Sequence, residues 1–239
     1  MTSISSLKLY ATQAHPCSYL DGAEATTVFI DPNAEMDAYL YGQLSHMGFR
    51  RSGPHVYRPS CESCSNCIPI RIAAFNFKPS RTQKRCVKTN QDLTVSVVPK
   101  IYSDEHYDLY ERYISARHND GEMFPPSRKQ YSDFLTGEWG MTRFMEFRDS
   151  DEKLLAVAVV DLLEQGLSAV YTYFSPEAEE RSLGRFAILY QIDLARRLQL
   201  PFVYLGYWIK DCQKMNYKTE YLPYELLLDN NWRSFKTKI

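Results

Sequence analysis

The sequence predicts a mixed fold of the α/β (α+β) class, in which helices flank a unit of antiparallel strands. Three observations in the second half of the chain predict it. Two stretches with helical spacing come first, at 103–118 and 127–137. Three strand-like stretches follow, and the last two are joined by a tight turn at 164–166. A long amphipathic stretch at 182–200 then separates these three strands from two further strand-like stretches.

Each element of this half has its own signal. Ser103 and Ser127 are expected to cap the first two helices, because a serine side chain accepts a hydrogen bond from a free N–H of the first turn. Pro201 ends the long helix. The strand-like stretches are 141–147, 154–163, 167–174, 202–208 and 224–229. The order helix, helix, three antiparallel strands, helix, strand, strand is typical of the GNAT acyltransferase fold.

Residues 1–100 are expected to form a smaller Cys-rich N-terminal domain, followed by a GNAT-like domain at 101–239. In the first of these a helix is predicted between a cap at Asp31–Asn33 and a stop at Gly48. The other predicted elements are extended stretches at 55–58 and 69–74, a helix capped by Ser80 and a strand at 92–100.

Composition excludes several classes of protein. The chain has 239 residues, of which 44% are hydrophobic, so it can bury a substantial core. Its formal net charge is −1, which excludes a global basic field, and any polyanion site must therefore be a local patch. No apolar run reaches the roughly 18 residues of a membrane span, and the N-terminus lacks an apolar signal region. We therefore expect a cytoplasmic protein with no membrane partner.

Three cysteines, Cys61, Cys64 and Cys67, follow one another at three-residue spacing. In a reducing compartment such thiols are more typical of metal ligands than of disulfides. Thiolates suit both zinc and an iron–sulfur cluster, and the sequence does not choose between them. The alternative is that the thiols are incidental. The candidates for a fourth ligand are Cys17 first, then His15 and His55.

The helix that Ser80 caps carries a basic stripe. Four cations recur there at three- and four-residue spacing and therefore share one face: Arg81, Lys84, Arg85 and Lys88. Such a stripe can follow a phosphate backbone, although a run of this kind is more often a solvated face.

The stretch RSLGRF, at 181–186, opens the long helix of the second half. Free N–H groups at a helix N-terminus, together with Arg181 and Gly184, can hold an anion. Phe186 occupies a position that is small in acetyl-CoA-binding turns of the GNAT fold. We therefore expect at most one phosphate here, and no CoA. The alternative is a simple capped helix.

Five stretches, taken together and in this order, resemble one known family. The stretches are PCSYL at 16–20, GFRRSGPHVYRPSCESCSNCIPIRI at 48–72, YERYISARHNDGEM at 110–123, YTYFSPEAEERSLGRFAIL at 171–189 and YLGYWIKDCQKMNYKTEYLPYELL at 204–227. They are similar to the aminoacyl-tRNA–protein transferases of the N-end rule, and most to the bacterial branch that transfers leucine. The resemblance covers nearly the whole chain.

The resemblance implies an activity. Such an enzyme takes leucine from leucyl-tRNA and joins it to the N-terminal Asp or Glu of a protein, and the new N-terminal leucine marks that protein for degradation. The donor ester is already activated, so no ATP is needed. The acceptor amine has a pKa near 8, so catalysis can consist mostly of positioning, with a base removing one proton.

The resemblance also suggests roles for individual residues. His118 or Asp120 would be the catalytic base. The acidic acceptor side chain would bind Arg50, Arg51 or Arg58, with Lys214 and Lys218 as second choices. Tyr171, Tyr173, Tyr207 and Trp208 would wall the pocket for leucine and the terminal adenosine. The tRNA phosphates would bind Arg81, Lys84, Arg85, Lys88, Arg181 and Gly184, and the metal or cluster would bind Cys17, Cys61, Cys64 and Cys67.

Three rival functions fit the same sequence. Transfer of arginine instead of leucine depends on a buried carboxylate in the donor pocket, for which the candidates are Glu122, Asp161 and Glu225. An acetyl-CoA-dependent N-acetyltransferase with a zinc-binding extension is a second rival. The third is a non-catalytic adaptor that binds acidic N-termini through the Cys loop.

Overall fold

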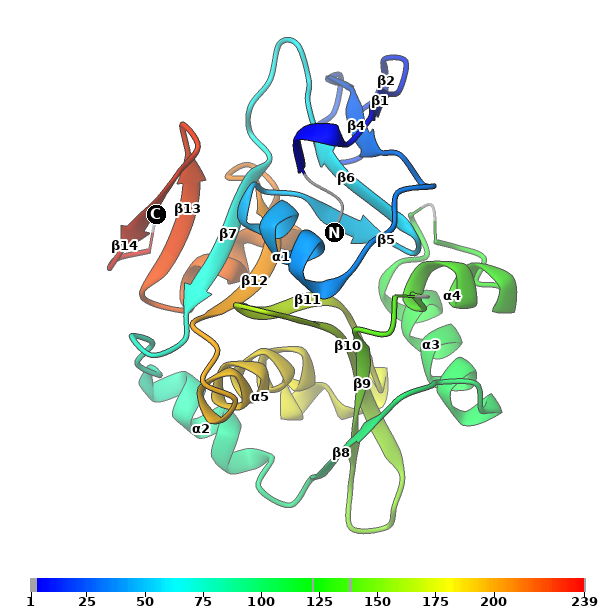
Figure 1. Ribbon diagram of the computed structural model, residues 1–239. Helices are drawn as coiled ribbons and strands as arrows, with labels where there is room; N and C mark the ends of the chain where they lie inside the picture. Colours follow the sequence, from blue (N-terminus) through cyan, green and yellow to red (C-terminus); the bar gives the residue numbers. More distant parts are fainter. Residues whose placement is uncertain (1–3, 122, 138, 239) are drawn as a thin grey trace.

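A computed structural model describes residues 4–238 apart from residues 122 and 138, and it has the mixed α/β architecture predicted from the sequence (Figure 1). The helices are η1 (Ile4–Ser6), α1 (Ala38–His46), α2 (Arg81–Thr89), α3 (Asp104–Arg117), α4 (Arg128–Leu135), η2 (Pro176–Arg181), α5 (Leu183–Arg197) and η3 (Gln213–Glu220). The strands are β1 (Leu9–Ala11), β2 (His15–Pro16), β3 (Glu24–Ala25), β4 (Thr27–Ile30), β5 (Arg50–Ser52), β6 (His55–Pro59), β7 (Ile68–Ala73), β8 (Thr94–Val98), β9 (Thr142–Arg148), β10 (Leu154–Leu163), β11 (Gly166–Phe174), β12 (Phe202–Trp208), β13 (Tyr224–Leu228) and β14 (Asn231–Phe235).

A large sheet of eight strands runs in the order β14-β13-β7-β12-β11-β10-β9-β8. Its neighbouring strands are antiparallel except for β11 and β12, which are parallel and are connected through α5. These two strands pair only over 166–168 and 202–204 and separate beyond that point. An antiparallel unit followed by a helix and one short parallel pair that separates is the GNAT-like topology that the element order predicts.

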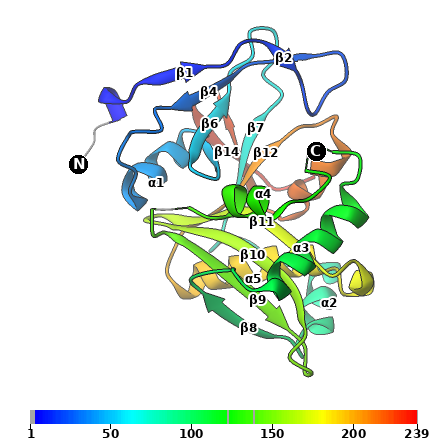
Figure 2. The same cartoon turned by 90° about the vertical axis from the view of Figure 1, so that its right-hand side faces the viewer.

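Helices cover both faces of this sheet (Figure 2). On one face, α5 and α2 pack over the largest core, whose members include Phe147, Ile192 and Val203. On the other face, α3 and α4 close a second core around Tyr110 and Tyr173. A smaller sheet, in the order β1-β4-β6-β5, lies with α1 beyond the end of the large sheet and has a third core.

Three serine caps are confirmed. Ser80, Ser103 and Ser127 each precede a helix and accept a hydrogen bond from the backbone N–H three residues later. At Ser80 the bond is reciprocal, since the side chain of Gln83 accepts from the Ser80 N–H at 2.8 Å. The predicted helices of the second half therefore begin where their polar caps lie.

The predicted cap of α1 is wrong. The side chain of Asp31 accepts from Asn33 N at 2.9 Å and so closes a local turn, whereas Asp37 accepts from Leu40 N at 2.7 Å and caps the helix. The sequence patterns also do not predict β1 to β5 or β14. These strands have two to five residues each, too few to show a period of two.

The large sheet takes strands from both sides of residue 100. β7 lies between β12 and β13, and β8 forms one edge next to β9. Both come from the first hundred residues, so strands from either side of the predicted boundary pair in one sheet. The division of the chain at this residue stays a prediction.

The side chain of Arg50 occupies the space where β11 and β12 separate. Its Nη2 donates hydrogen bonds to the carbonyl oxygens of Ala169 and Val170, at 2.8 and 3.2 Å. Val170 is the residue left without a partner where the pairing of β10 with β11 shifts its register. On the opposite strand Gly206 has a φ of +77°, and a Cβ at this position would lie 1.4 Å from Arg50 Nη1.

We expect Gly206→Ala to destabilise the protein more than Gly140→Ala. Both glycines have a positive φ, +77° and +73°. An alanine in this left-handed backbone conformation lowers the free energy of unfolding by about 1–2 kcal/mol in either variant. A Cβ at Gly140 meets nothing within 4 Å, whereas at Gly206 it displaces Arg50 from its two carbonyls. A loss of about 1 kcal/mol lowers the melting temperature of a chain this size by about 2–4 °C.

Differential scanning calorimetry on the two variants measures this difference. A melting temperature for Gly206→Ala at least about 3 °C below that of Gly140→Ala is expected. Equal values would show that Arg50 does not fill this space.

Candidate active site

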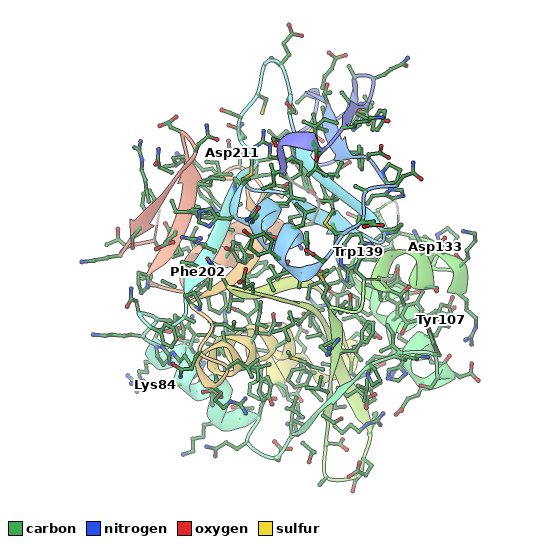
Figure 3. The ribbon with its side chains drawn as sticks, in the orientation of Figure 1. Lys84, Tyr107, Asp133, Trp139, Phe202 and Asp211 are labelled. Carbon is green, nitrogen blue, oxygen red and sulfur yellow. The ribbon has the colours of Figure 1, made fainter. Side chains whose placement is uncertain are left out.

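A cleft of about 660 Å³ opens beside the separating strands β11 and β12. Figure 3 marks Phe202 at the start of β12 and Asp211 just past its end. Six elements contribute to the walls: the C-terminal end of α3, β11, η2, the N-terminal end of α5, β12 and η3. Arg50 of β5 also reaches it, so the smaller sheet contributes to the cleft.

One wall of the cleft is apolar and aromatic. Ile188 and Leu205 line it together with the rings of Tyr113, Tyr171 and Phe174. Burial raises the pKa of Tyr113 to about 12 and that of Tyr171 further, so both hydroxyls are neutral at physiological pH. This wall can receive an uncharged aliphatic or aromatic group.

The cleft is also cationic, and three of its cations have carboxylate partners. Arg117 pairs with Glu179 at 3.0 Å, Arg185 with Glu220 at 3.0 Å and Lys214 with Asp120 at 3.3 Å. Lys214 and Asp120 have 68% and 65% of their side chains exposed, so this pair is weak and open to exchange. Arg50 and Lys218 complete a surplus of positive charge around the cleft.

Lys218 is buried at the base of the cleft. Its Nζ donates to the backbone carbonyl of Tyr207 at 2.5 Å. Burial lowers the pKa of Lys218 to about 7, and nearby Arg50 acts in the same direction, whereas the Cys212 thiol acts in the opposite one. At physiological pH this amine is therefore about half neutral.

His118 ends α3 and lies at the cleft wall, half-buried, with its Nε2 at 3.4 Å from the Tyr113 hydroxyl. Burial, followed by the charge of Lys214, lowers its pKa below the usual 6.5. Asp120 does not line the cleft. It is exposed, and its hydrogen bond with Lys214 lowers its pKa. Of the two predicted catalytic residues, the structure places only His118 at the cleft.

The structure brings part of the predicted set together in this cleft. The predicted residues that line it are Arg50, His118, Tyr171, Gly184, Lys214 and Lys218. Sequence reasoning did not assign a role to Tyr113, Arg117, Glu179, Tyr217 or Tyr221, which also line it. Four of these five fall inside the stretches 110–123 and 204–227, which carry the family resemblance. The resemblance therefore points to these stretches, but it does not indicate which of their residues line the cleft.

The predicted acceptor role of Arg51 is corrected here. Its guanidinium is bound bidentately by Asp161, with Nε at 2.5 Å and Nη2 at 2.8 Å from the two carboxylate oxygens, and both side chains have 0% exposure. Nη2 also donates to Thr142 Oγ1 at 3.0 Å. Arg51 is thus fully occupied and has no donor for an incoming carboxylate.

The carboxylates proposed for recognising a donor arginine lie outside the cleft or outside the described residues. Asp161 belongs to the buried pair with Arg51. Glu225 pairs with Arg71 at 2.7 Å, and neither residue lines the cleft. Glu122 lies outside the described residues. Within the described residues Glu179 is the one carboxylate at the cleft wall, and it is paired with Arg117.

Four further predicted residues lie away from the cleft. Arg58 donates to the carbonyl of Met47 at 3.1 Å. Tyr173 is fully buried in the core under α3 with its hydroxyl 3.0 Å from that of Tyr131. Tyr207 donates its hydroxyl to Gly48 O at 2.8 Å. Trp208 is buried in the core under α5. None of these four side chains lines the cleft, and their assignment to acceptor and donor pockets stays a prediction.

The turn before α5 is held by ion pairs and packing. Arg181 binds Asp92 bidentately, at 3.0 and 2.8 Å, and does not line the cleft. Gly184 does, and a Cβ there would meet the Phe174 ring at 3.1 Å. Phe186 is buried and packs on Phe147, with ring centroids 5.7 Å apart, so its ring points into the core and away from this turn.

The basic stripe of α2 is exposed, as predicted: Arg81, Lys84, Arg85 and Lys88 all face solvent, and Figure 3 marks Lys84. The buried face of the helix, through Gln83 and Cys86, packs toward α5. Since α5 begins at the cleft, the stripe lies on the helix next to the one that forms the cleft wall.

The four predicted ligands Cys17, Cys61, Cys64 and Cys67 line one separate cavity of about 210 Å³. Burial, followed by the other three cysteines, raises the pKa of Cys67 to about 12. In the described part of the chain no three His, Cys, Asp or Glu side chains are spaced as metal ligands. Four soft thiols on one cavity nevertheless form a donor set that fits zinc or an iron–sulfur cluster.

A GNAT-like fold with a cleft beside the separating strands β11 and β12 is compatible with an acyltransferase. The model of the arginine-tRNA–protein transferase N terminus matches residues 15–85, and that of the C terminus matches residues 105–228. The chain belongs to the arginine-tRNA–protein transferase family. It is an enzyme of the aminoacyl-tRNA–protein transferase class.

Three relatives share the name aspartate/glutamate leucyltransferase. The one from Teredinibacter turnerae is 64% identical over 97% of this chain and 96% of its own length. That from Saccharophagus degradans is 55% identical over 98% of this chain and 100% of its own. That from Pseudomonas fluorescens is 59% identical over 97% and 98%.

Proposed function

We infer that this chain transfers leucine from leucyl-tRNA to the N-terminal Asp or Glu of proteins, and so creates an N-terminal signal for their degradation. The observation that carries this inference is the 64% identity, over 97% of the chain, to a protein named aspartate/glutamate leucyltransferase. The cleft supports it, because apolar and aromatic side chains line it together with a surplus of cations. We place the reaction in the cytoplasm, because charged tRNA is found there. Among the described residues, every helix is too short or too polar to cross a bilayer.

The apolar wall supports leucine as the transferred residue. A donor arginine would need a carboxylate with free oxygens, because a buried unpaired cation is costly. Glu179, the one carboxylate among the described cleft residues, is 78% exposed and pairs with Arg117, so water screens its attraction for a second cation. Ile188 and Leu205 offer apolar contacts. A leucine side chain that leaves water for this wall gains roughly 1.5–3 kcal/mol.

The acceptor side chain is proposed to bind Lys214, with Arg50 beside it. The exposed Lys214–Asp120 pair is weak because water screens it, so an incoming carboxylate can replace Asp120 at little cost. Arg50 is fixed by the two β11 carbonyls and so presents its charge at a constant place. Glu and Asp acceptors differ by one methylene, which the flexible stem of Lys214 can accommodate.

The chemistry requires alignment of two substrates and little else. An ester is exchanged for a more stable amide, so neither ATP nor CoA takes part. Holding the amine against the ester carbonyl supplies most of the acceleration. The cleft provides both kinds of group for this purpose, apolar side chains for the leucine and cations for the acceptor carboxylate and the tRNA 3′ end.

The tRNA is proposed to continue from the cleft over α2. Arg81, Lys84, Arg85 and Lys88 supply an unpaired basic surface on the helix next to α5, whereas Arg181 is held by Asp92. Sequence-independent contacts to phosphates suit this exposed stripe, since aminoacyl-tRNA is recognised here as a polyanion.

The four cysteines of the 210 Å³ cavity are proposed to hold one zinc ion or one iron–sulfur cluster. Cys17 precedes β3 and β4, and the other three lie on the loop between β6 and β7. A group bound to all four would join the N-terminal segment to the loop that leads into the large sheet. When bound, it supplies a structural crosslink between them.

Transfer itself is the first test. Purified protein receives radiolabelled leucyl-tRNA or arginyl-tRNA and peptides that begin with Asp, Glu, Lys or Ala. We expect leucine on the Asp and Glu peptides alone. Transfer of arginine to the same peptides would show that arginyl-tRNA, and not leucyl-tRNA, is the donor. Protein that binds Asp peptides but transfers neither residue would favour the adaptor, and protection from heat by acetyl-CoA alone would favour the acetyltransferase.

The stripe predicts a salt-dependent effect on tRNA affinity. Lys84→Ala should weaken leucyl-tRNA binding and reduce the slope of log K against log salt by about 1, because one fewer phosphate contact releases counterions. Lys153→Ala, in the exposed turn between β9 and β10, is the matched control and should leave the slope unchanged. Identical slopes in fluorescence titrations of both variants would show that α2 does not contact the tRNA.

The cysteine set predicts a stoichiometric metal content. Protein purified without oxygen should contain about one zinc per chain, or iron and sulfide with visible absorption, by elemental analysis and spectroscopy. Cys64→Ser should lose the metal, whereas Cys86→Ser, on α2 and outside the cavity, should retain it. Wild-type protein with metal only at background level would contradict the assignment.

A further inference from the structure

We propose that Lys218 is the general base that removes the proton from the acceptor α-ammonium group. This inference rests on the proposed transfer reaction and adds the residue that activates its nucleophile. Sequence reasoning had placed Lys218 among the groups that bind the acceptor carboxylate, and had assigned the base to His118 or Asp120.

The position of Lys218 is unusual for a lysine. Only 7% of the residue is exposed, yet it lines the cleft from η3. Its amine donates to the carbonyl of Tyr207, and within the described residues no carboxylate pairs with it. A buried lysine without a carboxylate is stable only if it gives up its charge easily. The fold therefore maintains a partly neutral amine at the wall of the reaction cleft.

Neighbouring groups from several elements shift the pKa of Lys218. Arg50 of β5 disfavours the protonated form, and the Cys212 thiol before η3 favours it by a smaller amount. The ring of Tyr217 lies 5.9 Å from Nζ. Burial is the largest effect and lowers the pKa of Lys218 to about 7. The other titratable groups of the cleft are Tyr113, Arg117, His118, Tyr171, Glu179, Arg185, Lys214 and Tyr221.

This basicity suits the acceptor. An α-ammonium group has a pKa near 8, so transfer of its proton to an amine with a pKa near 7 is unfavourable by only about tenfold. His118 is a weaker base, because burial lowers its pKa below 6.5. General bases work best when their pKa is close to the working pH, and Lys218 meets this condition better than His118 does.

The step balances as follows. Neutral Lys218 Nζ takes one proton from the acceptor ammonium. The resulting amine nitrogen forms a bond to the ester carbonyl carbon, and the bond from that carbon to the ribose O3′ breaks. The second proton of the attacking nitrogen leaves with O3′, which becomes the 3′ hydroxyl of the tRNA. Lys218 then releases its proton to solvent, so the reaction yields an amide, free tRNA and one proton.

Chemical rescue tests this role. Lys218→Ala should lower kcat for Asp-peptide leucylation by about 10²–10⁴, the usual contribution of a general base. Ethylamine, 2-fluoroethylamine and 2,2,2-trifluoroethylamine are similar in size and fall in basicity in that order. At equal concentrations of free base, we expect them to restore peptide product in the same order. Product is counted on the peptide, because added amines also consume leucyl-tRNA directly.

Two further variants separate this role from charge and packing. Lys218→Arg retains a cation but cannot deprotonate, so kcat should fall by at least about 100-fold while the KM for the Asp peptide changes by less than about threefold. Lys218→Met preserves the apolar stem and covers the case in which Lys218→Ala does not fold. Lys210→Ala, exposed and outside the cleft lining, is the matched control and should keep wild-type kcat.

The outcomes distinguish this inference from the proposed function. Wild-type protein that transfers no leucine overturns both. If the wild type transfers leucine, then Lys218→Arg or Lys218→Met with wild-type kcat overturns the general base alone. Rescue of Lys218→Ala that is independent of amine basicity does the same, because it shows that the amines only fill a cavity.

Discussion

The contact of Arg50 with two carbonyls of β11 is the interaction on which the cleft depends. Parallel strands that stop pairing expose backbone groups, and here the guanidinium satisfies the oxygens of Ala169 and Val170. Gly206 permits this because it carries no Cβ in the path of the side chain. The same cation favours a neutral Lys218 and faces the space that the substrates share. One side chain from the smaller sheet therefore sets both the shape and the charge of a site in the larger one.

The charges of the molecule are divided by burial into two groups. The Arg51–Asp161 pair is closed to water and contributes to the fold, and removing one partner of such a pair usually costs about 3–5 kcal/mol. The paired cations of the cleft are instead at exposed or half-buried positions, as Lys214 is with Asp120 and Arg185 with Glu220. This division explains how a chain with a net charge of −1 can present a locally cationic site.

Local signals in the sequence predicted much of the second half of the fold. Ser103 and Ser127 act through neighbouring backbone groups, so their caps could be predicted without any knowledge of tertiary structure. The site was predicted less well. Arg50 and Arg51 are identical neighbours, and only the partners that Val170 and Asp161 supply from distant strands place one at the cleft and the other in the core. The burial of Lys218 depends on packing in the same way.

The alternation of β5 has a consequence for how this enzyme can be altered. Successive residues of a strand face opposite sides, so β5 sends Arg50 to the cleft and Arg51 to the core. A chimera that combined the N-terminal portion of one relative with the catalytic portion of another would have to keep two sets of contacts. These are the hydrogen bonds of Arg50 to the β11 carbonyls and the ion pair of Arg51 with Asp161. The two portions are therefore expected to be exchanged only as a unit. In a hybrid that mismatched them, Arg50 and Arg51 would lose their partners on opposite faces of β5.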